Sequence, residues 1–125
     1  MKIAACVVLI GLALSGCGSK QAAAGMILVS AAKDAVSSAM KDPQSVEFRN
    51  VRTVDLVTEA GTGLIVCGEF NAKNGFGGYS GFEKFAWHPD GKLLARSLFP
   101  EEGRPLVDSA IETFCSGRMP IAQGV

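Results

Sequence analysis

The spacing of hydrophobic and polar positions predicts one small α+β domain, ordered as a helix, four strands and a helix. Between residues 23 and 41, apolar residues recur every three or four positions, as they do on one face of an amphipathic helix. Pro43 disfavours the helical conformation at Asp42, so we expect this helix to end at about Lys41. The positions of the apolar face are Met26, Val29, Ala32 or Lys33, Val36 and Met40.

Two segments with the period-two alternation of β-strands follow the helix. The first runs from Val46 to Val57 and changes parity once, at Asn50, which predicts a β-bulge there. The second, residues 64–70, includes Gly68, where packing is weakened or another backbone comes close. Its predicted faces are Leu64, Val66 and Phe70 on one side and Ile65 and Cys67 on the other.

Two shorter strands and a second helix complete the prediction. The strands cover residues 80–87 and 92–97, on either side of a turn at His88-Pro89-Asp90-Gly91. A helix begins near Glu101 and Pro105 and ends at Gly117, which suits a C-cap. We expect both helices to cover one face of an antiparallel sheet of three to four strands, a two-layer sandwich whose other face is partly solvated.

The first residues have the pattern of an export signal. Lys2 supplies a positive start, and the 12 residues from Ile3 to Leu14 are apolar and uncharged. A membrane-spanning helix needs about 20 such residues, so this segment matches the core of a secretory signal instead.

The next four residues, Leu14-Ser15-Gly16-Cys17, resemble the lipobox of bacterial lipoproteins. The resemblance implies cleavage before Cys17 and acylation of its thiol, with palmitate among the expected acyl groups. Two or more acyl chains hold a protein durably on a membrane. Gly18 in place of Asp favours the outer membrane by resemblance to enterobacterial lipoproteins, and retention at the inner membrane stays open. The alternative is a plain secretory signal with a chance cysteine.

These observations divide the chain into four parts. Residues 1–16 are the expected signal peptide and residues 17–25 a short tether off the membrane. Residues 26–117 form the single α+β domain, and residues 118–125 a loose tail.

The cysteine count then predicts a disulfide. Of four cysteines, Cys6 leaves with the signal and Cys17 carries lipid, so Cys67 and Cys115 remain in an oxidising periplasm. In the chain-entropy model, a bond between them stabilises the domain by roughly 4 kcal/mol. The alternative, a reactive thiol, needs an activating neighbour that the sequence does not identify.

The middle of the chain has a further resemblance. The pattern Lys41-Asp42-Pro43-x-Ser45-x-x-Phe48, followed by Cys67-Gly68-x-x-Asn71-x-Lys73-Asn74-x-x-Gly77-Gly78-Tyr79-x-Gly81-Phe82, is similar to a group of small exported proteins of bacteria and their prophages. The resemblance implies export, the disulfide and the fold, and no particular chemistry.

Charge and residue types narrow the function classes. The chain has 12 basic and 12 acidic residues, whereas a nucleic-acid partner needs a basic face. The single histidine, His88, fits a turn, and with the two cysteines bonded we expect no metal or cofactor site. The glycines at 75–81 precede a strand and not a helix, so they do not form a phosphate loop.

The glycine-rich segment is the candidate recognition site. Glycines expose backbone and rings to a partner without steric cost. Alternatively, Asn71 and Asn74 hydrogen-bond the loop to itself, while Tyr79 and Phe82 pack in the core. A surface cluster of Phe76 and Tyr79 would favour recognition. The candidate partner-binding residues are Asn71, Lys73, Asn74, Phe76 and Tyr79.

The expected function is therefore a non-enzymatic, lipid-anchored envelope protein that binds another envelope component, such as an envelope protein, through this segment. A periplasmic small-ligand binder, or an enzyme acting on envelope material, is the alternative. It requires a cleft lined by Asn71, Lys73 and Asn74. A stable spacer on the membrane is a third option.

Overall fold

The structure, a computed structural model, describes the backbone of residues 17–117 and the side chains of residues 23–117. The signal peptide predicted for residues 1–16 and the tail predicted for residues 118–125 lie outside the described residues. Four antiparallel strands form one sheet in the order β1-β2-β3-β4, which confirms the predicted α+β fold. The elements are α1 (Cys17–Ala39), β1 (Glu47–Thr58), β2 (Gly61–Asn71), β3 (Glu83–Trp87), β4 (Leu93–Ala95) and α2 (Arg104–Cys115).

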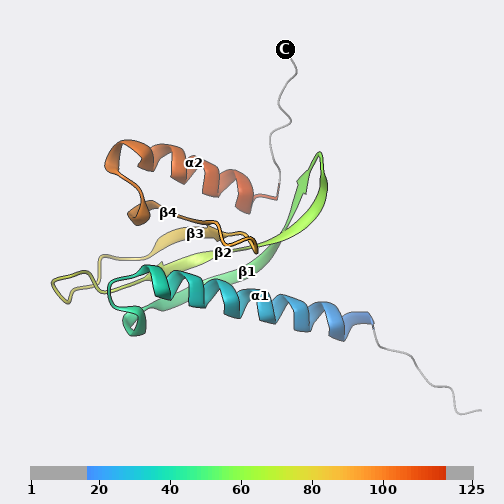
Figure 1. Cartoon of the computed structure of the whole chain (residues 1–125), viewed down its shortest axis with the longest axis horizontal. Coiled ribbons are helices and arrows are strands. Elements are labelled where there is room, and N and C mark those ends of the chain that lie inside the picture. The colour runs from blue at the N-terminus through green and yellow to red at the C-terminus, as the bar shows by residue number, and fades with distance from the viewer. Residues whose placement is uncertain (1–16, 118–125) are drawn as a thin grey trace, which may run out of the picture.

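The two helices cover opposite faces of the sheet (Figure 1). This differs from the expectation that both lie on one face. The reason is that β2 and β3 are apolar on both sides, so each helix finds its own apolar surface. Beneath α1 the buried residues are Ala32, Val36, Val66, Phe70, Phe85, Trp87 and Ala95. Beneath α2 they are Ile65, Cys67, Ala86, Val107 and Ile111.

Helix α1 is longer than predicted at its start and shorter at its end. The segment 17–25, predicted as a tether, has helical backbone and is continuous with the rest of α1. Val36 is fully buried as predicted, but Met26 is 73% exposed. Gly25 faces β1, because a Cβ built there would lie 3.8 Å from the Thr53 methyl carbon. Met26 is therefore turned by about 100° from the stripe that faces the sheet.

The predicted bulge in β1 is confirmed. The register between β1 and β2 shifts between Arg49 and Arg52, and Asn50 has a φ of 54°, in the left-handed region. Gly68 of β2 lies against the bulge, where a Cβ would come within 2.9 Å of the Val51 Cα and Cγ2 atoms. Gly68 thus permits the close backbone approach expected from its place in a strand.

The remaining boundaries differ by a few residues. Strands β1 and β2 pair up to Thr58 and Gly61, so their turn is shorter than predicted. Strand β3 begins at Glu83 and not at residue 80, because residues 80–82 still belong to the preceding loop. Helix α2 begins at Arg104, and Gly117 follows it with a φ of 75°, as a C-cap glycine does.

The predicted disulfide is also present. Cys67 in the middle of β2 is bonded to Cys115 at the end of α2, with Cα atoms 5.9 Å apart. The bond fastens the second helix to the sheet. Within residues 17–117, no helix is both long and apolar enough to span a membrane.

Candidate functional site: the glycine-rich loop

The glycine-rich loop, residues 72–82, joins β2 to β3 and projects from one end of the sheet. In Figure 1 it lies at the left, at the opposite end of the long axis from the start of α1. Its placement follows from the strands, since β2 ends beside the beginning of β1, where Asn71 pairs with Glu47.

Asn74 organises the tip of this loop. Its side-chain oxygen accepts hydrogen bonds from the backbone N–H groups of Phe76 (2.9 Å) and Gly78 (3.2 Å). The Asn74 backbone N–H donates to the Gly78 carbonyl at 2.8 Å, and the Gly77 N–H donates to the Asn74 backbone carbonyl at 3.0 Å. Four hydrogen bonds thus close a compact turn around one asparagine. Within the loop, positive φ occurs at Gly77 and Gly81, and not at Asn74 or Gly75.

The base of the loop is fixed as well. The Asn71 side-chain oxygen accepts the Gly81 N–H at 3.1 Å, and Lys73 and Tyr79 form an isolated antiparallel bridge. Ser45, in the turn between α1 and β1, accepts the Lys73 N–H on its hydroxyl at 3.0 Å. Its carbonyl accepts the Tyr79 hydroxyl at 2.9 Å. The loop is therefore braced against a second segment of the chain.

The aromatic residues of the loop are on the surface. Phe76 is fully exposed, and Tyr79 is 43% exposed. Phe82 is 36% exposed, and the Arg49 guanidinium lies 3.9 Å from its ring centroid. The alternative predicted from the sequence is therefore right for Asn71 and Asn74, which hold the loop together. It is wrong for the two rings, neither of which is buried.

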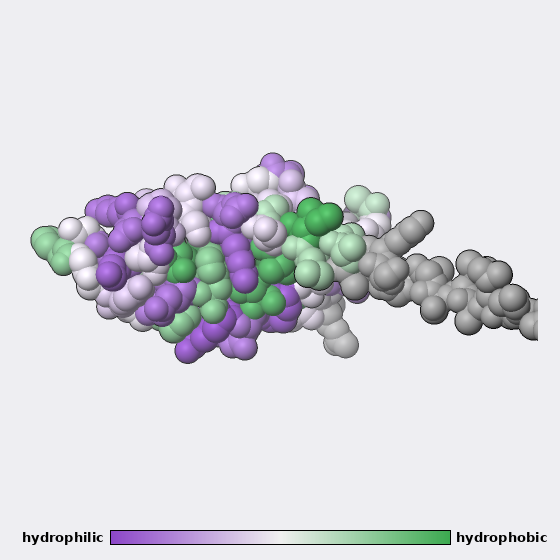
Figure 2. Space-filling view, turned by 90° about the horizontal axis from the view of Figure 1, so that it is seen from below, coloured by the Kyte–Doolittle hydropathy of each residue, from purple (hydrophilic) through white to green (hydrophobic). Residues whose placement is uncertain are grey.

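Two ammonium groups lie close to the glycine-rich loop. The Lys73 nitrogen lies 5.7 Å from the centroid of the Tyr79 ring, and the Lys41 nitrogen lies 3.5 Å from where a Cβ of Gly75 would stand. Figure 2 shows the end of the molecule as a small hydrophobic tip that projects beyond hydrophilic residues. The loop thus presents an exposed apolar side chain, Phe76, and has two ammonium groups close to its neighbouring residues.

Three clefts of the domain lie away from the glycine-rich loop. One of about 500 Å³ lies beside the disulfide, one of about 340 Å³ is mostly apolar and lined by Leu56, Ile65 and Phe114, and one of about 380 Å³ lies beside Arg96. Asn71, Lys73 and Asn74 line none of these three. Sequence reasoning expected these residues to line a cleft if the protein binds a small ligand, and they do not contribute to any of these three clefts.

His88 and Trp87, outside the loop, have contacts that stabilise a turn and the core. His88 is exposed in a turn, and its Nδ1 atom lies 2.9 Å from the Asp90 carboxylate. The pKa of Asp90 is lowered, first because the Lys92 N–H donates to its carboxylate. Trp87 is buried in the core beneath α1 and is 7% exposed. Within the described part of the chain, no three histidine, cysteine or acidic side chains are close enough to hold a metal ion.

Sequence reasoning missed a polar cluster on the α2 face. Arg49 donates to both carboxylate oxygens of Glu69, at 3.1 and 3.2 Å, and the Asn50 side chain donates to the same group at 2.8 Å. The pKa of Glu69 is lowered, chiefly by the Arg49 hydrogen bonds and next by that of Asn50. The parity change at Asn50 was the signal, because it places residues three apart on one face.

Comparison with known proteins adds no relative. No protein-family model, no curated protein and no solved structure matches this chain. The geometry of the loop is therefore the main guide to function.

Proposed function

We propose that the protein is a non-enzymatic, lipid-anchored component of the bacterial cell envelope that binds another envelope component through the glycine-rich loop. The single observation that carries the binding half of this proposal is the full exposure of Phe76 on a loop held by its own hydrogen bonds. The anchoring half rests on the resemblance of residues 14–17 to a lipobox.

The energetics favour recognition by this ring. Burying a phenylalanine side chain contributes about 1.5–3 kcal/mol relative to leaving it in water. Aromatic residues also dominate the binding energy of many interfaces. Because Asn74 already fixes the turn, little conformational entropy is lost when a partner covers Phe76. The favoured partner therefore carries an apolar pocket, with polar or acidic groups at its rim to meet Lys41 and Lys73.

The arrangement of the anchor and the loop favours a partner away from the anchoring bilayer. Helix α1 has 23 residues, which span about 34 Å at the usual helical rise. An acylated Cys17 would stand at the start of this helix, while the loop lies at the far end of the molecule (Figure 1). An envelope protein is thus the expected partner. The resemblance to prophage proteins favours an envelope receptor or a protein involved in DNA entry.

The test is cross-linking in cells that carry the native protein. A photoreactive phenylalanine analogue replaces Phe76, and a matched strain carries it at Leu106, an apolar residue of α2 that is 76% exposed. We expect one protein to be enriched by mass spectrometry from the first strain and not from the second. Phe76→Ala should have the same effect on cells as deletion of the protein, and it should not lower the melting temperature of the purified protein.

Two results would contradict the proposal. Equal cross-linking from positions 76 and 106 would mean that the ring has no preferred partner. An unchanged phenotype in the Phe76→Ala strain, with normal protein levels, would remove the loop from the function and favour the small-ligand or spacer alternatives.

A further inference from the structure

A second surface, on the α2 face of the sheet, gathers three cations beside the disulfide. Because of the bulge, Arg49 and Arg52 pair with Glu69 and Cys67, two residues of β2 that point to the same face. Lys84 of β3 stands opposite Glu69 and shares this face. In a regular strand the two arginines would lie on opposite faces, so the bulge brings them together.

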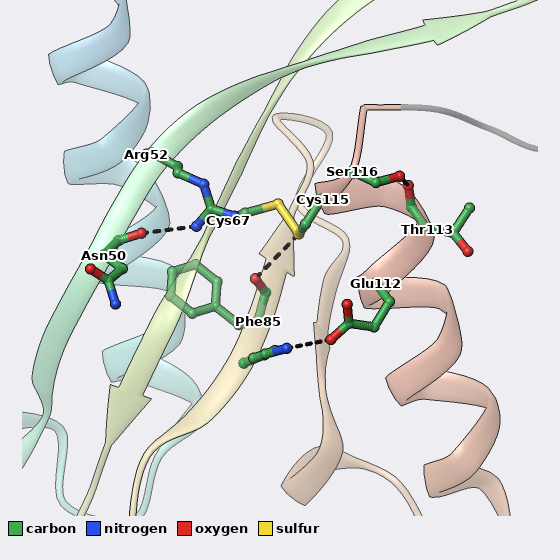
Figure 3. Close-up of a disulfide and its surroundings, with 9 residues drawn as sticks. Asn50, Arg52, Cys67, Phe85, Glu112, Thr113, Cys115 and Ser116 are labelled. Carbon is green, nitrogen blue, oxygen red and sulfur yellow. Dashed lines mark hydrogen bonds and ion pairs between the residues drawn. A yellow bond between two sulfur atoms is a disulfide. The ribbon is translucent and has the colours of Figure 1, made fainter.

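Two of these cations line a groove between the sheet and α2, with a volume of about 500 Å³. Arg52 extends from β1 toward the disulfide, and Glu112 reaches in from α2 (Figure 3). Ile111, which is almost fully buried, forms part of the groove wall on the α2 side.

The groove is lined by two cations, Arg52 and Lys84, and by two carboxylates, Glu69 and Glu112. Glu69 is already bound by Arg49 and Asn50, and Glu112 is bound by Lys84. The Arg52 guanidinium donates to the Asn50 carbonyl at 3.1 Å, and among the described residues it forms no ion pair. A guanidinium has five N–H donors, so most of those on Arg52 are left for solvent or a ligand.

The two cations that line the groove also act on one another. The pKa of Lys84 is raised, first by its hydrogen bond with Glu112 and next by the charge of that carboxylate. Arg52 acts in the opposite direction, which places its positive charge within reach of the ammonium group. An anion between them would relieve this repulsion.

We propose that this groove binds an anionic group, a carboxylate or a phosphate, with Arg52 as the principal donor and Lys84 as the second. The planar fork of arginine matches two oxygens of either anion. Lys84 is available for exchange, because its pair with Glu112 is exposed on both sides and such pairs contribute little to stability. The site is distinct from the glycine-rich loop, so it does not depend on the function proposed above.

The first experiment measures anion binding to the full chain by NMR. The chain is titrated at constant ionic strength with inorganic phosphate and, separately, with acetate, while the resonances of Arg52 and Lys84 are followed. We expect saturable shifts with at least one anion, and the tighter of the two identifies the ligand class. Arg52→Gln should weaken binding roughly ten-fold. Arg96→Gln is the matched control, because Arg96 is paired with Asp108 at 3.0 Å and does not line this groove.

A second pair of variants separates a built site from general charge attraction. Glu112→Gln frees Lys84 and should tighten binding about three-fold. Asp108→Asn removes the same charge one helical turn away on α2 and should leave binding unchanged. The proposal is overturned if neither anion gives saturable shifts at Arg52 and Lys84, if Arg52→Gln binds like the unmodified chain, or if both neutralising variants tighten binding equally.

Discussion

Replacing Gly68 by alanine tests the packing of β1 on β2 at the bulge. The new Cβ would lie 2.9 Å from both the Cα and the Cγ2 atoms of Val51, and 3.1 Å from the Phe85 ring. One of these neighbours is backbone, which the hydrogen-bonded register on either side of the bulge holds in place. The strand must therefore move, and cannot simply turn a side chain aside.

The expected cost follows from this crowding. Overpacking a closely packed site by one methyl group typically destabilises a protein by about 1–3 kcal/mol. Because the Val51 backbone is fixed, we expect Gly68→Ala to fall near about 2–3 kcal/mol, which lowers the melting temperature of a domain of this size by roughly 10 °C.

Thermal and urea unfolding, followed by circular dichroism, measure this effect. Gly63→Ala is the matched control in the same strand, since a Cβ there meets no atom within 4 Å. It should be neutral, or stabilise by up to about 1 kcal/mol through the unfolded chain. A Gly68→Ala variant within about 0.5 kcal/mol of the unmodified protein would refute the packing argument.

Three further predictions concern the Cys67–Cys115 disulfide, the polar cluster around Glu69 and helix α1. Replacing both Cys67 and Cys115, whose sequence separation is 48, should lower the free energy of unfolding by roughly 4 kcal/mol, and reducing agent should mimic this in denaturation curves of the unmodified protein. The pKa of Glu69 is depressed below its usual 4.5, so its contribution to stability is complete above that pH and is lost as the pH falls through the folded value. Glu69→Gln should therefore flatten the fall of the unfolding free energy in acid, and an unchanged acid slope would contradict the cluster. Val36→Ala should cost about 2 kcal/mol because Val36 is fully buried, whereas Met26→Ala should change stability by less than about 0.5 kcal/mol, and similar losses would contradict the orientation of α1.

Much of the fold follows from local pattern. The alternation of apolar residues predicts each strand, and the single change of parity correctly locates the bulge at Asn50. Pro43 and Gly117 end the two helices near their predicted residues, because each restricts or permits specific backbone angles. These features depend only on neighbours along the chain.

The distribution of the helices could not be predicted in the same way. Whether α2 shares a face with α1 depends on which side of β2 and β3 each helix finds apolar, and both sides are. The exposure of Met26 has a similar origin, since a shift of one position in the helical stripe satisfies the same spacing.

In the candidate site, too, local sequence predicts the contacts between neighbouring residues and not those between distant ones. Asn74 in a glycine-rich turn predicts a loop that bonds to itself, and it does. The exposure of Tyr79 depends on a hydrogen bond to Ser45, 34 residues earlier in the chain. No local pattern predicts a contact over that separation.

Export and acylation at Cys17 are the central claim, and intact-mass analysis of protein extracted from native membranes measures both. We predict a chain that begins at residue 17, carries acyl groups on its first residue and has Cys67 and Cys115 oxidised. A chain that retains residues 1–16, has no added lipid and contains free thiols at positions 67 and 115 would contradict the account.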